Sequence, residues 1–291
     1  MGQSAVAAAL VQLGKARDLI NAAMMTLTPP VVTPPVDVPP IVVVPPVVVV
    51  PPVVGTTAAE RFGWTRLVWS DEFTVDGVPD MTRWQLAGGG VGGSWPGHNG
   101  NGRRADKNTR IVGGVLTMTG EANGDSGWLA SQHAAQYGRW EMRCRSFATA
   151  QVNRDRQYHP VLIIWPDSDR WPEEGEYDFL ENGQPGAAAA ESFIHYPHPA
   201  SVDTQQEFAR APKTTPMSEW HNVAIEWTAE HVRGFLDGVV WFSYSGGAGP
   251  NGRGAIQAMP SGRLSIQLDD FYGGNMQPCK FEIDWVRMWE L

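Results

Sequence analysis

The stretch Trp171–Asn182, which reads WPEEGEYDFLEN, decides how this chain is interpreted. If the stretch forms a β-strand, its side chains alternate between two faces. Glu176 and Asp178 then share one face, and the aromatic residues beside them point into a core. Glu181 has the wrong parity to join these two acids unless the strand contains one extra residue, as a β-bulge does. We therefore expect a bulged strand with three carboxylates on one face.

Three neighbouring acids repel each other, so a purely structural strand has no reason to collect them. A sugar-cleaving site does have a use for them, because one carboxylate attacks the anomeric carbon and a second, protonated one releases the leaving oxygen. Asp178 lies between the two glutamates, where it can orient Glu176 or share a proton with it. A solvated acidic strand face is the alternative interpretation, and the motif alone does not separate the two.

The pattern E-x-D-x-x-E resembles the signature of glycoside hydrolase family 16, the laminarinase, agarase and carrageenase group. Its two-residue spacer matches the bulged branch of that family and not the shorter lichenase branch. Four further stretches resemble the family in the same order, and with the motif they span about residues 62–291. They are LVWSDEF (Leu67–Phe73), YGRWEMRCR (Tyr137–Arg145), WHNVAIEWTAEHVRGFLDG (Trp220–Gly238) and FEIDWVRMWE (Phe281–Glu290).

The resemblance implies an all-β fold, a concanavalin A-like β-jelly-roll sandwich with a concave cleft. It also implies that Glu176 is the nucleophile, Glu181 the general acid/base and Asp178 the assisting acid. The expected activity is that of a retaining endo-β-glycanase, which hydrolyses or transglycosylates β-1,3- or β-1,4-linked glucan or galactan in a cell-envelope or extracellular polysaccharide. A non-catalytic carbohydrate-binding module is the alternative, although proteins of this fold that only bind sugar usually lose these glutamates.

Four residues are candidates for binding the polysaccharide. Trp171 resembles the family's cleft tryptophan, and its flat ring suits stacking on a sugar. His195, in FIHYP, matches a family histidine near the acid/base, but a core or surface histidine is an equally good interpretation. Trp95 lies in the glycine-rich loop Gly88–Gly102, which we interpret as a cleft rim. Gln267 stands where the family usually has Asn, which puts the leaving-group subsites in doubt.

No cofactor is required by this chemistry. Asp284 matches an aspartate near a structural calcium in some relatives and is a weak candidate for a metal ligand. Cys144 and Cys279 cannot form a disulfide framework, and strand parity predicts that Cys144 is a buried free thiol, with a single bridge left open. Four tryptophans in apolar strands are expected in the core: Trp165, Trp227, Trp285 and Trp289.

The rest of the chain reads as short strands separated by turns. The 291 residues include 13 Trp and 32 Gly, only 18% are charged, and the net charge of −9 argues against nucleic acid as a partner. We predict strands, stacked as two antiparallel sheets, at 67–73, 109–112, 115–119, 127–131, 139–147, 161–165, 176–181, 192–196, 222–228, 232–236, 239–243, 264–268 and 281–289.

The N-terminal part has a different character. Residues 1–27 contain an amphipathic helix that must bury its apolar stripe on a partner protein or on copies of itself. Residues 28–57 form a Pro/Val-rich linker that favours polyproline II, and residues 58–291 form the catalytic domain. Lys15, Arg17 and Asp18 interrupt the first apolar run, so we predict neither a secretory signal nor a membrane span. A docking helix, a stalk and a glycan-cleaving head together suggest an extracellular or virion-associated protein, such as a phage tail component.

Overall fold

The computed structural model describes residues 56–154, 156–181, 189–204, 206–212, 215–247, 254–273 and 275–291. The predicted helix over 1–27 and nearly all of the predicted linker lie outside these residues. Within the described part of the chain the elements are α2 (Ala58–Phe62), β1 (Leu67–Asp71), β2 (Trp84–Leu86), β3 (Ser94–Pro96), β4 (Arg103–Ala105), β5 (Thr109–Val112), β6 (Val115–Gly120), β7 (Asp125–Ser126), β8 (Trp128–Ala135), β9 (Gly138–Ala148), β10 (Tyr158–Pro166), β11 (Glu176–Glu181), β12 (Glu191–His195), β13 (Gln206–Arg210), β14 (His221–Trp227), β15 (Val232–Leu236), β16 (Val239–Tyr244), β17 (Gly262–Asp270) and β18 (Cys279–Trp289).

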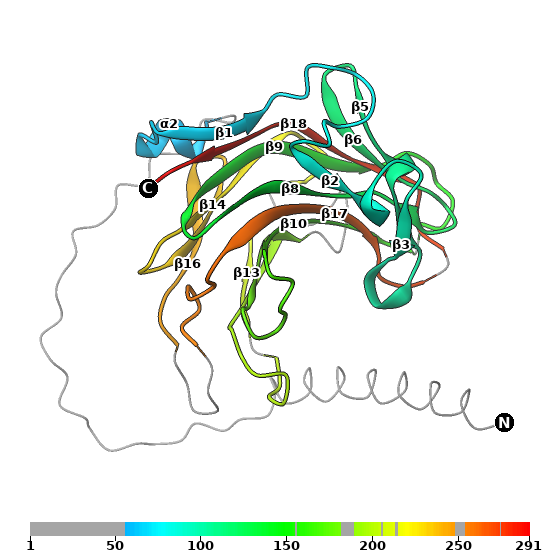
Figure 1. Cartoon of the computed structure of the whole chain (residues 1–291). Coiled ribbons are helices and arrows are strands. Elements are labelled where there is room, and N and C mark those ends of the chain that lie inside the picture. Colours follow the sequence, from blue (N-terminus) through cyan, green and yellow to red (C-terminus); the bar gives the residue numbers. More distant parts are fainter. Residues whose placement is uncertain are drawn as a thin grey trace, which may run out of the picture. The chain divides into compact units, whose positions relative to one another are not determined.

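Two antiparallel sheets form the body of the fold. One has the order β16-β15-β14-β9-β18-β6-β5, with β1 also paired to β18, and the other has the order β13-β12-β11-β10-β17-β8-β2. Figure 1 shows them stacked, with β9, β14 and β18 in one layer and β8, β10 and β17 in the other. A small third sheet, β3-β4-β7, lies beside them. This is the sandwich that the sequence predicts.

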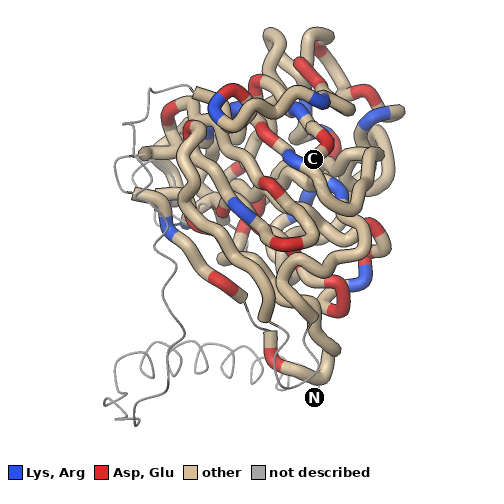
Figure 2. The backbone as a smooth tube through the Cα atoms, turned by 90° about the vertical axis from the view of Figure 1, so that its left-hand side faces the viewer, with Lys and Arg blue, Asp and Glu red and all other residues tan. Residues whose placement is uncertain are grey.

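The core lies between the two large sheets and follows from strand alternation. On β9, Trp140, Met142 and Cys144 point into it, while Arg143 and Arg145 point outward. These outward arginines form ion pairs with carboxylates of the neighbouring strand β18. Figure 2 shows that basic and acidic residues are interspersed along the backbone in this way over the described part of the chain. Cys144 and Cys279 are both buried and free, as predicted for Cys144.

Every predicted strand is present, although several begin or end one to four residues away from the predicted bounds. The sequence does not predict the short strands β2, β3, β4 and β7, the edge strand β13 or the helix α2. Elements of two to five residues have too few positions to show a period. The glycine-rich segment Gly88–Gly102 is also more ordered than a plain loop, because it contains β3 and hydrogen-bonded 3-10 turns.

Helix α2 lies against the outer face of the β9 sheet. Thr57 and Glu60 form a capping box at its N-terminus. The Glu141 carboxylate, from β9, accepts hydrogen bonds from the backbone N–H groups of Ala58 and Ala59 at 2.5 and 3.0 Å. Burial of Glu141 raises the pKa of its carboxyl to about 7. In the described residues, no helix reaches the length and hydropathy that a membrane span requires.

Candidate active site

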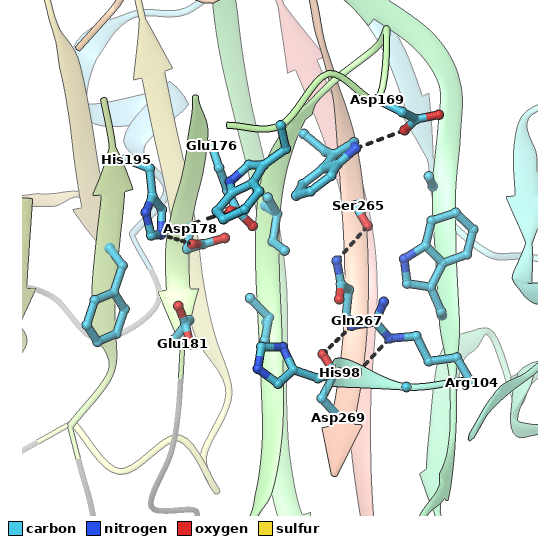
Figure 3. Close-up of a pocket in the computed structure, with 18 of the residues that line it drawn as sticks. His98, Arg104, Asp169, Glu176, Asp178, Glu181, His195, Ser265, Gln267 and Asp269 are labelled. Carbon is cyan, nitrogen blue, oxygen red and sulfur yellow. Dashed lines mark hydrogen bonds and ion pairs between the residues drawn. The ribbon is translucent and has the colours of Figure 1, made fainter. Parts of the chain in front are cut away.

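A cleft of about 800 Å³ lies on the face of the β11 sheet that is turned away from the core. Its lining extends from Gln85 on β2, one edge strand of this sheet, to Gln206 on β13, the other edge strand. The cleft therefore crosses the whole width of the sheet. Figure 3 shows the polar side chains that project into it from neighbouring strands.

Strand β11 is bulged, as the sequence predicts. Asp178 pairs with Ile163 of β10, and Leu180 pairs with the adjacent Leu162, so Phe179 is one residue too many for the ladder. The pairing with β12 shows the same shift between Asp178 and Glu181. A bulge of this kind turns the residues that follow it to the opposite face.

The bulge brings the three predicted carboxylates onto one face. Glu176, Asp178 and Glu181 all line the cleft, and Figure 3 shows them along one strand. Asp178 is the most enclosed of the three, with only 3% of its surface exposed. The predicted constellation is therefore present, and the separate roles assigned to these acids stay predictions.

His195 belongs to the same cluster, but it lies at the Glu176 end of the motif and not at the Glu181 end, where it was expected. It pairs in register with Glu176, and its Nε2 lies 3.2 Å from Asp178 Oδ2 and 4.0 Å from Glu176 Oε2. The resemblance places this histidine near the acid/base Glu181. Because the bulge shifts the register, the residue opposite Glu181 on β12 is instead Glu191.

The carboxyls of Glu176 and Asp178 lie close together beside His195, with one oxygen of each within 4.8 Å of the other. The pKa of Glu176 is raised well above its ordinary value, first by burial and then by the charge of Asp178. The pKa of Asp178 is raised for the same first reason and then by the charge of Glu181. Two close carboxyls in such a site hold one proton jointly, so one can stay ionised while the other is neutral.

A second histidine, which sequence reasoning missed, lies at the other end of the motif. His159 Nε2 is hydrogen-bonded to Glu181 Oε2, and the imidazole stacks on Phe271 with ring centroids 3.8 Å apart. The predicted strand begins at Val161, whereas β10 begins at Tyr158 and includes His159. Extending the alternation of β10 back by two residues from Val161 would have placed this histidine on the cleft face.

Tryptophans surround the cleft. Trp171 is 41% exposed at its wall, and Trp95 packs edge-to-face on Trp128 with ring centroids 4.8 Å apart. Trp165, predicted to be in the core, instead lines the cleft, where its indole N–H donates to Asp169 at 2.9 Å. The core prediction was wrong because Trp165 alternates with Val161 and Ile163 on the face of β10 that lines the cleft.

The remaining predicted tryptophans are buried in different places. Trp227 lies in the main core, and Trp289 belongs to a smaller cluster beside α2. Trp285 is buried on the outer side of β18, where the Arg287 guanidinium lies 4.3 Å from its ring centroid.

Strand β17 provides a polar floor. Gln267 lines the cleft, and its side-chain amide donates to Ser265 Oγ at 3.2 Å. Two residues further, the Asp269 carboxylate accepts two hydrogen bonds from the Arg104 guanidinium at 2.6 and 2.7 Å. Neither Asp269 nor Arg104 was predicted, although Asp269 shares the parity of Gln267.

The weak metal candidate lies elsewhere. Asp284 is on β18 and forms an ion pair with Arg143 at 2.8 Å, so a calcium ion there would have to compete with that arginine. A structural calcium at this position stays a prediction. Among the described residues, one group brings three ligand-type atoms within 4.8 Å of one another, and it consists of Glu176, Asp178 and His195 in the cleft.

An antiparallel β-sandwich with a carboxylate-lined cleft across one sheet fits a glycoside hydrolase. Two neighbouring acids can provide a nucleophile and a proton donor in such an enzyme, and aromatic rings can stack on sugar faces.

Comparison with known proteins identifies the family. The chain is 30% identical over 210 residues to a β-glucanase of Rhodothermus marinus, covering 66% of this chain and 69% of that protein. The structure of the laminarinase from Rhodothermus marinus matches with a TM-score of 0.60 and 25% identity, over 78% of this chain and 97% of that one. SCLam, a non-specific endo-β-1,3(4)-glucanase from family GH16, matches with a TM-score of 0.59 and 21% identity, over 77% and 91%. No protein-family model matches the chain. The chain belongs to glycoside hydrolase family 16.

Proposed function

We propose that this chain is a retaining endo-β-glucanase that cleaves β-1,3-linked or mixed β-1,3/β-1,4-linked glucan. The observation that supports this most is the bulge in β11, because it brings Glu176 and Glu181 to one cleft face with Asp178 between them. The cleft spans both edge strands of its sheet, which suits a polymer that passes through the site and is cut internally.

The reaction follows from these positions in two steps. Glu181 donates a proton to the glycosidic oxygen, the bond between that oxygen and the anomeric carbon breaks, and a Glu176 oxygen bonds to that carbon. Asp178 keeps the shared proton, so that Glu176 attacks as a carboxylate. In the second step water attacks the anomeric carbon and gives a proton to Glu181 while the ester bond between Glu176 and that carbon breaks, which restores both residues. An acceptor sugar in place of water gives transglycosylation.

Release of reducing ends from a panel of polysaccharides tests the proposal. We expect activity on laminarin or on mixed-linkage glucan and little on carboxymethylcellulose or agarose. Glu176→Gln should lose activity by several orders of magnitude and still bind the same glycan. Equal activity in both proteins would reject Glu176 as the nucleophile. Saturable binding without product in the wild type would favour the carbohydrate-binding alternative.

The N-terminal segment adds a proposal about location. We assign it to an extracellular or virion-associated setting, with residues 1–27 docking on a partner protein or on sister copies through an apolar helical stripe. A fragment that starts after Gly55 should sediment as a monomer with unchanged kcat/KM on short oligosaccharides. The full chain should sediment as an oligomer or be recovered with its partner, and a stable monomeric full chain would contradict this.

A further inference from the structure

We infer that His159 is a positioning residue for the general acid/base: it holds Glu181 in the orientation from which its proton is delivered. This inference rests on the proposed function, because it requires that Glu181 acts as acid and base. It concerns a histidine that no motif in the sequence singles out.

The contact is enclosed and specific. His159 Nε2 is hydrogen-bonded to Glu181 Oε2, and the two side chains are 7% and 14% exposed. The backbone fixes this approach, since Val161 pairs in register with Glu181 and His159 lies two residues along β10 on the same face. Bulk water therefore has little access to this oxygen of Glu181.

Aromatic contacts also hold the His159 imidazole in place. It stacks on Phe271 with an interplanar angle of 25°, and Phe271 in turn contacts His98 with ring centroids 4.2 Å apart. Asp269 pairs in register with His159, but both of its carboxylate oxygens accept hydrogen bonds from Arg104. Glu181 is therefore the carboxylate to which His159 Nε2 is bound.

The chemical consequence concerns one oxygen of Glu181. When His159 Nε2–H donates to Oε2, the transferable proton of the acid resides on the other oxygen, Oε1. As that proton passes to the glycosidic oxygen, Glu181 becomes a carboxylate, and a hydrogen bond to an ionised acceptor is stronger than one to a neutral acceptor. His159 thus stabilises the charge that forms as the leaving group departs.

The test uses two substrates that differ in their need for a proton. In a β-1,3-glucan oligosaccharide the leaving group is a sugar hydroxyl, which must be protonated by the acid as it departs. In the 2,4-dinitrophenyl β-glycoside of the same sugar the leaving group is 2,4-dinitrophenolate, which departs without protonation. In the full chain, His159→Phe keeps an aromatic ring against Phe271 but removes the donor. We expect kcat/KM to fall about 10- to 100-fold on the oligosaccharide and less than about threefold on the dinitrophenyl glycoside.

Two further variants sharpen the outcome. His159→Gln, whose amide N–H can reach Oε2, should recover part of the activity on the oligosaccharide. His133→Phe is the matched control, because His133 stacks on Trp69 and lines a separate pocket beside Tyr137. It should leave both substrates unaffected. Equal losses on the two substrates for His159→Phe, or no loss on either, would overturn the inference.

Failure of the proposed function has a different signature. With Glu181→Ala and the dinitrophenyl substrate, added azide should restore turnover and yield a β-glycosyl azide, as expected when the acid/base alone is missing. Absence of this rescue would reject the role of Glu181 and, with it, that of His159. Rescue together with equal losses in His159→Phe would reject only the role of His159.

Discussion

Phe179 and Leu180 are neighbours in the sequence, yet both side chains are fully buried in the same hydrophobic core. In a regular strand, one of the two would face the cleft. Their common direction is the structural mark of the bulge in β11 and the reason that Glu181 returns to the cleft face.

Truncating either residue should therefore destabilise the fold. We expect Phe179→Ala to lower the free energy of unfolding by about 3–5 kcal/mol and Leu180→Ala by about 2–5 kcal/mol. Urea denaturation of the two variants measures both losses. A near-neutral effect at one of these positions would mean that its side chain faces the cleft and that the strand is regular.

Asp178→Asn should change the pH dependence as well as the rate. Burial and then the charge of Asp178 raise the pKa of Glu176. Asp178 carries this charge only after the pair has lost its shared proton, so the raised pKa belongs to the second ionisation of the pair. Asn has no such proton to lose, so the loss of activity at alkaline pH that comes from this ionisation should be absent from the kcat/KM profile of the variant. The maximal rate should fall about 100-fold or more, because Asn cannot hold the shared proton. An alkaline limb of kcat/KM that is identical in the variant and the wild type would argue against a shared proton.

Trp171→Ala tests the aromatic wall. The ring is 41% exposed in the cleft, so its loss should weaken sugar stacking without disturbing the core. We expect KM for a long glucan to rise about 3- to 10-fold with little change in kcat, in line with the energy of one aromatic contact. Steady-state kinetics on long and short oligosaccharides check this, and a fall in kcat at constant KM would not fit a stacking role.

Glu141 should make stability depend on pH. Its carboxyl has a pKa of about 7 in the folded protein against 4.5 for an unperturbed group, so between these values the folded chain binds a proton that the unfolded chain has released. Stability from this group is present below about pH 4.5 and is lost as the pH rises through about 7.

The matched comparison is Glu141→Gln, which cannot titrate. Relative to this variant, the wild type should lose about 2–3 kcal/mol of unfolding free energy between these two pH values. Chemical denaturation at several pH values measures the difference. A difference between the two proteins that does not vary with pH would show that Glu141 is ionised throughout.

Much of the fold could be predicted from the sequence, because long alternating strands such as Arg139–Phe147 show their period directly. The bulge could be predicted as well, since the spacing of Glu176, Asp178 and Glu181 allows one face only with an extra residue. The side chains that bind the cleft carboxylates could not be predicted. His159, the partner of Glu181, lies before the predicted strand. Arg104, the partner of Asp269, lies on a three-residue strand that is too short to show a period.

The register with which a bulged strand pairs with its neighbours also cannot be predicted from a single sequence. His195 could be assigned to the strand after the motif, but which of the three acids it meets depends on where the ladder shifts. Trp165 illustrates a similar limit, because an apolar strand that lines an aromatic cleft has the same composition as one that lines a core.

The central claim, that Glu176 is the nucleophile of a retaining glycosidase, is tested most directly by trapping the covalent intermediate. The full chain would be incubated with a 2-deoxy-2-fluoro β-1,3-glucobioside that has an activated leaving group, and the labelled peptide would be identified by mass spectrometry. We predict one sugar per chain, attached through an ester to Glu176. Attachment to Asp178 or Glu181, or turnover of the native glucan with release of the inverted anomer, would contradict it.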